Sequence, residues 1–313
     1  MGRGLSSVDL VKLALRLYRP IRLRTGLWRP GVDVASRLAS SLKGVVGEGD
    51  VLVLSEKALA VARGLVFDES RVRPSRASMA TTYLLMRVAW GYLLGPLCKL
   101  KPETLNWLRS YPIVEGARHK QLAASLGGLL EALKPSSEAG VDASNLPYSL
   151  VALPLRDAGS VADEVRRRLL EEVGVDLTVV VADSDRLYHH RRLNLALTSR
   201  RASVEGGLYM GFLAFVIGRS LRGGFTPFAT PLAVAGPRLD KWVLLGLVEL
   251  ADRLRGYGAG RTAFEAAERL GAPVDGVTWS MLERLAHYPA VLFKPRRSSS
   301  VGGSPLPPPA RRP

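Results

Sequence analysis

The stretch Leu177-Thr178-Val179-Val180-Val181-Ala182-Asp183-Ser184-Asp185 gives the strongest indication of the fold. Its first six residues are mostly apolar and β-branched, which is typical of a strand buried on both faces of a sheet. The polar residues that follow predict that this strand ends at Asp183 in an acidic loop. Asp183 and Ser184 could hold a hard divalent cation through a carboxylate and a hydroxyl. A turn that caps the next segment accounts for the same residues equally well.

A second unit of similar design comes earlier in the chain. A turn at Gly49-Asp50 leads into the apolar run Val51-Leu52-Val53-Leu54, and Ser55 can cap a helix over residues 56–63. A helix that begins directly after a buried strand is suited to phosphate binding, although an ordinary capped helix explains these residues at least as well. Other periodic segments predict a strand at residues 21–25 and helices at residues 32–42, 75–133, 162–173, 239–254 and 263–270, with breaks after Gly95, Lys101 and Tyr111.

These alternating signals place the chain in the mixed α/β (α+β) class, with mixed sheets and helical additions. We predict one domain over residues 1–293. The composition changes after Pro295, where Pro, Ser, Gly and Arg dominate. Such a segment has too little apolar surface to pack, so residues 294–313 are predicted to form a disordered basic tail. The tail could contact nucleic acid or serve only solubility.

The overall charge narrows the classes of ligand. The chain has 313 residues, is 47% hydrophobic and carries a formal net charge of +16, which favours anions such as nucleotides, phosphorylated metabolites or nucleic acid. Cys98 is the single cysteine, so an intrachain disulfide and a thiolate zinc site are excluded. We expect Cys98 to be buried, and we expect a cytoplasmic protein without a signal peptide or membrane span.

A second acidic loop lies at Glu138-Ala139-Gly140-Val141-Asp142-Ala143-Ser144-Asn145-Leu146-Pro147. Asp142 and Asn145 could face one ligand from a single turn, but the same residues are also common turn chemistry. Upstream, Arg118-His119-Lys120 adds cations that could bind phosphate oxygens if they lie beside the acidic loops.

Taken in order along the chain, these segments resemble one known family. The run Gly49 to Ser55, the pair Arg118-His119, the stretch Ala139 to Pro147 and the pair Asp183-Ser184 are together similar to the coenzyme F420-0:L-glutamate ligase family, and the similarity extends over residues 21–236. The resemblance implies an amide ligase that uses GTP with Mg2+ or Mn2+. Such an enzyme adds L-glutamate to the carboxylate of a deazaflavin phosphodiester precursor through an acyl phosphate, and it implies a homodimer.

The resemblance also implies roles for individual residues. Asp142, Asp183 and Ser184 would be metal ligands, and Arg118 and His119 would be catalytic contacts to phosphate or substrate. The remaining positions would contact the nucleotide: Asn145, Ser55, Lys57, Leu27 and Trp28.

The chain departs from the family pattern at several positions. Val61 stands where the family has a lysine, and Phe215 stands where it has an acidic residue. An additional stretch that includes Gly127-Gly128 separates His119 from Asp142. These differences leave two alternatives open: a ligase that acts on another carboxylate, and a nucleotide- or nucleic-acid-binding paralogue without ligase activity.

Overall fold

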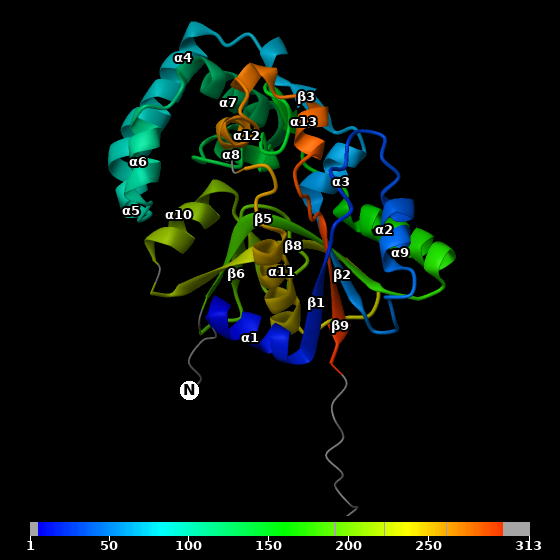
Figure 1. The fold of residues 1–313 in the computed structure, drawn as a ribbon. Helices are drawn as coiled ribbons and strands as arrows, with labels where there is room; N and C mark the ends of the chain where they lie inside the picture. The colour runs from blue at the N-terminus through cyan, green and yellow to red at the C-terminus, as the bar shows by residue number, and fades with distance from the viewer. Residues whose placement is uncertain (1–5, 191, 222, 261, 297–313) are drawn as a thin grey trace, which may run out of the picture.

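The computed structural model describes residues 6–190, 192–221, 223–260 and 262–296. A central seven-stranded sheet has helices on both faces, and a mainly helical region lies over one of its ends (Figure 1). The mixed α/β class is therefore confirmed. The strands of the central sheet are β1 (Tyr18–Leu23), β2 (Val51–Ser55), β5 (Thr178–His190), β6 (Ala196–Thr198), β7 (Gly207–Tyr209), β8 (Phe225–Ala235) and β9 (Ala290–Pro295).

The sheet order is β1-β9-β2-β5-β6-β7, and β8 also pairs with β5. β2 and β5, the two strands predicted from apolar runs, pair in parallel, with Val51 opposite Thr178. Alternate residues of β2 point to opposite layers, as the two-residue period of a strand requires. Leu52 and Leu54 pack with α2 (Val34–Leu42) and α9 (Ala158–Val173), whereas Val51 and Val53 pack with α1 (Ser7–Leu17) and α11 (Lys241–Arg255).

The predicted end of the strand at Asp183 is wrong. β5 runs on to His190 because β8 pairs with it on both sides of an irregularity between Asp183 and Arg186. Such a bulge leaves residues outside the hydrogen-bonded ladder without ending the strand. Asp183, which pairs with Thr230, therefore borders a bulge in mid-strand, and Ser184 lies on that bulge rather than in a loop.

Most predicted helices are confirmed, and Ser55 caps its helix as expected. Asp33, Ser55 and Asp157 accept hydrogen bonds from the first turns of α2, α3 (Glu56–Ala62) and α9. The predicted break after Gly95 is wrong. The Gly95 N–H binds the carbonyl of Trp90, five residues back, and this wider π-type turn accommodates Pro96 without ending the helix.

The helical region is built from the predicted segment 75–133 and from residues near the C-terminus. Its elements are α4 (Arg76–Thr82), the π-helix η2 (Tyr83–Leu94), α5 (Gly95–Leu97), α6 (Pro102–Arg109), α7 (Ile113–Gly127), α8 (Leu129–Ala132), η3 (Glu138–Gly140), α12 (Ala263–Leu270), η4 (Val274–Gly276) and α13 (Trp279–Glu283). A two-stranded sheet of β3 (Val66–Asp68) and β4 (Leu150–Ala152) adjoins it, β3 being followed by η1 (Glu69–Arg71), and α10 (Phe212–Ser220) packs near the far end of β5. Cys98 is fully buried in this region, as predicted.

The predicted boundary at residue 293 falls inside a strand. β9 continues to Pro295 and is inserted between β1 and β2, where Lys294 binds the buried Asp50 at 2.9 Å. Pairing with Arg19 and Tyr18 of β1 keeps Lys294 and Pro295 in the folded domain. The rest of the predicted tail, residues 297–313, lies outside the described residues.

Candidate functional site

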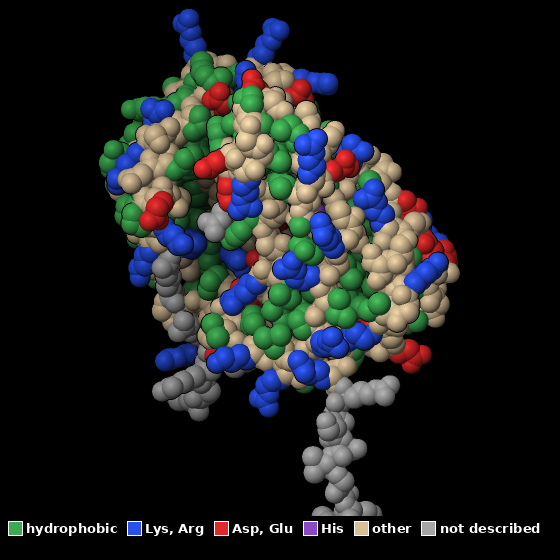
Figure 2. Space-filling model, in the orientation of Figure 1, with side chains coloured by type: hydrophobic (Ala, Val, Ile, Leu, Met, Phe, Trp, Pro, Cys, Tyr) green, Lys and Arg blue, Asp and Glu red, His purple; other side chains and the backbone are tan. Residues whose placement is uncertain are grey.

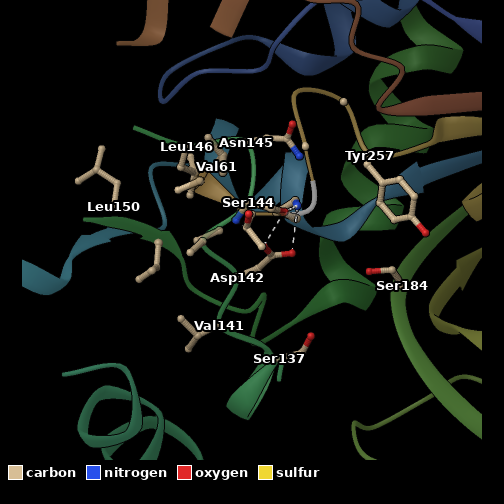
Figure 3. Close-up of a pocket in the computed structure, with 18 of the residues that line it drawn as sticks. Val61, Ser137, Val141, Asp142, Ser144, Asn145, Leu146, Leu150, Ser184 and Tyr257 are labelled. Atoms are coloured by element: carbon tan, nitrogen blue, oxygen red, sulfur yellow. Dashed lines mark hydrogen bonds and ion pairs between the residues drawn. The ribbon is translucent and has the colours of Figure 1, made fainter. Parts of the chain in front are cut away.

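A large cavity lies between the sheet and the helical region, with a volume of about 1410 Å3. This exceeds the volume that one small ligand usually fills, so the cavity can hold more than one substrate. The sequence-predicted site residues all line it, although they come from distant parts of the chain: Leu27, Trp28, Ser55, Lys57, Arg118, His119, Asp142, Asn145, Asp183 and Ser184. Figure 3 shows Asp142, Ser144 and Asn145 together, with Ser184 and Tyr257 further along the cavity.

Asp142 is held by its own loop and by the helix after β2. Backbone hydrogen bonds with Ala152 join its loop to β4. Its Oδ1 accepts hydrogen bonds from the Ser144 N–H and hydroxyl, both at 2.7 Å, and its Oδ2 accepts one from Lys57 Nζ at 3.0 Å. Burial by itself raises the pKa of Asp142, but Lys57 and Ser144 outweigh it and hold the pKa below its usual value. Asp142 is therefore a carboxylate at neutral pH.

Asn145 is oriented by a part of the chain that is distant in sequence. Its backbone is left-handed, with φ of 59°, a conformation that asparagine tolerates. Its Oδ1 accepts a hydrogen bond of 2.5 Å from the backbone N–H of Ala259. This contact fixes the amide, so that the Nδ2 donors are the groups left for a ligand.

Asp183 belongs to a buried ion network that the sequence did not reveal. Arg200 binds Asp183 Oδ2 at 2.7 Å through Nη1 and Glu56 Oε1 at 3.0 Å through Nη2. A Cβ on Gly140 would lie 2.9 Å from the Arg200 guanidinium, so this glycine allows Arg200 to pack against the other acidic loop. Arg200 thus connects the two acidic segments. The local sequence Ser199-Arg200-Arg201 has no feature that distinguishes it from a surface basic run.

His119 is a cation rather than a free base. Its ring nitrogens contact Glu69 at 2.6 Å and Glu138 at 3.1 Å. Burial alone lowers the pKa of His119, but the two carboxylates outweigh burial and raise the pKa from 6.5 to about 10. Lys120 binds the other oxygen of Glu138 at 2.6 Å, and the buried Lys134 binds Asp185 at 2.7 Å. The predicted Arg118-His119 pair therefore adjoins the acidic loops, with its histidine positively charged.

The predicted nucleotide contacts lie on the side of the cavity formed by β2 and α3. Ser55 ends β2 and caps α3, so its hydroxyl is directed at the helix backbone. Leu27 and Trp28 line the cavity but are largely buried, and Trp28 Nε1 donates to Thr25 Oγ1 at 3.0 Å. These two residues can present only a small part of their surface to a ligand.

The two departures from the family pattern differ in position. Val61 lines the cavity and packs against Leu146 and Ala152, so an apolar residue occupies the wall where the family has a lysine. Phe215 packs edge to face on Trp90, with ring centroids 5.7 Å apart. Within the part of the chain that the structure describes, Phe215 is not among the residues that line the cavity.

The donor groups do not form a site that would enclose a cation in protein, and they would suit a hydrated divalent cation only together with phosphate oxygens. Among the described residues there is no cluster of three or more His, Cys, Asp or Glu side chains that could hold a metal. Mg2+ usually binds one or two carboxylates together with water and phosphate oxygens. Asp142, Asp183 and Ser184 supply carboxylate and hydroxyl oxygens of this kind, although Lys57 and Arg200 at present neutralise the two carboxylates.

Fold and site together define a mixed α/β protein with a charged cavity suited to anionic small molecules. The model of the F420-0:gamma-glutamyl ligase family matches residues 22–200, more than half of the chain, and the chain belongs to this family of ligases. An uncharacterized protein of Methanocaldococcus jannaschii is 35% identical over 256 residues, which cover 79% of this chain and 85% of that protein. The coenzyme F420:L-glutamate ligase of Methanopyrus kandleri is 31% identical over 156 residues. That alignment covers 50% of this chain and 55% of the Methanopyrus protein, so the chain spans about half of that ligase.

Within the described residues of 6–296, no helix is long and apolar enough to cross a bilayer.

Proposed function

We propose that this protein is a GTP- and divalent-metal-dependent ligase that adds L-glutamate to the carboxylate of the deazaflavin precursor coenzyme F420-0. Membership of the ligase family supports glutamate ligation. The observation that carries the proposal is the cavity, because it gathers two acidic segments and the basic side chains of Lys57, Arg118 and His119 from distant parts of the chain. A carboxylate, a triphosphate and an amino acid all require such a charged and roomy site.

The proposed chemistry has two balanced steps. A carboxylate oxygen of the acceptor attacks the γ-phosphorus of GTP, the bond to the β-phosphate oxygen breaks, and GDP leaves. The glutamate amine then attacks the acyl carbon of the resulting acyl phosphate, inorganic phosphate leaves, and the nitrogen loses a proton. Neither step needs a protein nucleophile, so the protein acts by positioning and charge stabilisation.

Individual residues have the following proposed roles. Asp142, Asp183 and Ser184 would hold Mg2+ or Mn2+, which when bound neutralises phosphate charge. Asn145, Ser55, Lys57, Leu27 and Trp28 would bind GTP. Arg118 and His119 would stabilise negative charge, because His119 already carries a proton between Glu69 and Glu138.

A homodimer is part of the proposal. Apolar side chains stand exposed on η2, among them Leu84, Tyr92 and Leu93. Exposed apolar side chains on one helix favour association with another protein surface. Light scattering after size exclusion should give twice the mass of the chain, and a monomer at micromolar concentration would contradict this part.

The activity is tested by GDP release with coenzyme F420-0, L-glutamate, GTP and MgCl2. Release should require both acceptor and glutamate, and the product should gain one glutamyl group by mass spectrometry. Calorimetry with GTP and with ATP, each with and without MnCl2, tests the choice of nucleotide and metal. Absence of GDP with every carboxylate acceptor tried would reject the ligase.

The second candidate is a nucleotide- or nucleic-acid-binding paralogue without ligase activity. The net charge of +16 favours it, as do Val61 and Phe215 at positions where the family has charged residues. Figure 2 shows Lys and Arg side chains distributed over the visible face rather than gathered in one patch. Binding to RNA or DNA should weaken steeply with salt if this surface is used. If binding is lost in Asp142→Asn, polyanion binding is contradicted, since removal of a negative charge should not weaken it.

A further inference from the structure

Arg255, the last residue of α11, lines the cavity from outside the segment that matches the family. Its side chain is only 8% exposed. A guanidinium carries five N–H donors and stays charged, so its burial is favourable only when anions or acceptors surround it. The partners of Arg255 therefore indicate whether the site is complete.

The contacts of Arg255 within the described chain do not satisfy all of its N–H donors. The nearest carboxylate oxygen is Asp252 Oδ1, at 3.6 Å from Nη2. The other oxygen of Asp252 is bound more closely, at 2.9 Å, by Arg186. Among the residues that the structure describes, Arg255 Nη1 has no hydrogen-bond partner.

The other acids of this region are already bound by other arginines. Asp183, whose charge acts on Arg255, is bound by Arg200 at 2.7 Å. Glu249 is bound by Arg186 at 2.6 Å and by Arg253 at 2.9 Å. The cavity that Arg255 lines has room for a further partner.

A second buried donor lies unused in the same cavity. Arg118 Nε has no hydrogen-bond partner within the described part of the chain, and Arg118 also lines this space. Two guanidinium groups from segments far apart in sequence, each with one buried N–H that has no partner among the described residues, thus border one cavity. Guanidinium groups bind carboxylate and phosphate oxygens in preference to other ligands.

We propose that Arg255 binds an oxyanion of a substrate in this cavity, either a carboxylate or a phosphate group. The inference rests on the proposed function for the two sources of that oxyanion, L-glutamate and GTP. Arg255 is thereby a substrate-binding residue supplied by the C-terminal segment.

Calorimetric titration of the full chain tests whether Arg255 binds an oxyanion. The three separate probes are inorganic phosphate, L-glutamate, and GTP with MgCl2. Arg255→Gln should weaken the binding of at least one probe by about tenfold or more, because it removes a charged donor. The affected probe identifies the source of the oxyanion. Arg255→Lys should lose less affinity for that probe, since lysine keeps the positive charge but lacks the planar guanidinium donors. Arg167→Gln is the matched control, because Arg167 is 65% exposed on α9 and pairs with Glu171.

The outcomes separate this inference from the proposed function. If the wild-type protein ligates glutamate and both Arg255 variants bind all probes as it does, the ligase stands and this inference is overturned. If the wild-type protein releases no GDP but phosphate affinity falls in Arg255→Gln, the inference stands without the ligase. If Arg255→Gln fails to fold, unchanged affinities in Arg255→Lys overturn the inference. Absence of binding of any probe to the wild-type protein also overturns it.

Discussion

The segment that matches the family, residues 22–200, and the C-terminal segment, residues 201–296, contribute differently to the site. The first contains the sequence-predicted site residues, from Leu27 to Ser184. The second contains none of the predicted site residues, yet its Ala259 binds Asn145 and its Arg255 lines the cavity. The motifs therefore led to residues that share one cavity, but not to the residues that hold them in place.

The two segments are also inseparable in the fold. β9, from the C-terminal segment, lies between β1 and β2, and β8 pairs with β5 along most of its length. A sheet shared in this way should unfold as one unit. The predictions below test the difference between the segment that carries the predicted site residues and the segment that holds them in place.

The largest effect is expected from Phe293→Ala in β9. Phe293 is fully buried between the sheet and α11, so its truncation should lower the free energy of unfolding by about 3–5 kcal/mol. Urea denaturation followed by circular dichroism measures this. Leu129→Ala is the control, because Leu129 is 80% exposed and should change stability by less than about 0.5 kcal/mol. Two separate unfolding transitions would show that the segments fold independently.

In the matched segment, Asp142→Asn should lower the rate of GDP release by about 10²–10³. The substitution keeps the shape of the side chain but leaves Lys57 without its counter-charge. Steady-state kinetics at saturating GTP and glutamate give the comparison. Asp176→Asn serves as the control, since Asp176 is 46% exposed and pairs only with Arg166 among the ion pairs of the described chain. An unchanged rate in Asp142→Asn would remove this residue from the site.

The buried His119 should make the free energy of unfolding depend on pH. Because the folded pKa of His119 is raised from 6.5 to about 10, its contribution to stability is complete below pH 6.5 and is lost as pH rises toward 10. Over this window the free energy of unfolding should fall with increasing pH through His119, because the folded state binds its proton more tightly than the unfolded state does. Urea titrations at several pH values should show that His119→Gln removes this dependence. The same slope in the variant would assign it to other groups.

The smallest effect is expected from Gly258→Ala in the C-terminal segment. Gly258 has φ of 57°, and a Cβ there would lie 2.5 Å from Asn145 Oδ1. Displacement of Asn145 should weaken GTP binding by about fivefold, as measured by calorimetry. Gly271→Ala is a matched control, with φ of 62° and no heavy atom within 4 Å of the added Cβ. If both variants bind GTP equally, backbone strain rather than contact with Asn145 explains any loss.

Several parts of the fold could be predicted because their signals are local. The apolar run of β2, its Ser55 cap and the apolar stretch of β5 each depend on neighbouring residues. The continuation of β5 past Asp183 could not be predicted, because polar residues normally end a strand and only pairing with β8 overrides them. The position of β9 depends in the same way on strands distant in sequence.

The sequence by itself determined the residue types of the site, the order of its segments and the family. Tertiary structure alone decided which charged side chains pair with one another. Lys57 binds Asp142, which is 85 positions away in the sequence, and Arg200 binds Glu56, which is 144 positions away. Tertiary structure also decided the charge of His119 and the open donor of Arg255. The physical reason is that charge, pKa and hydrogen-bond satisfaction depend on distance and burial, which the chain acquires only when separate segments pack around one cavity.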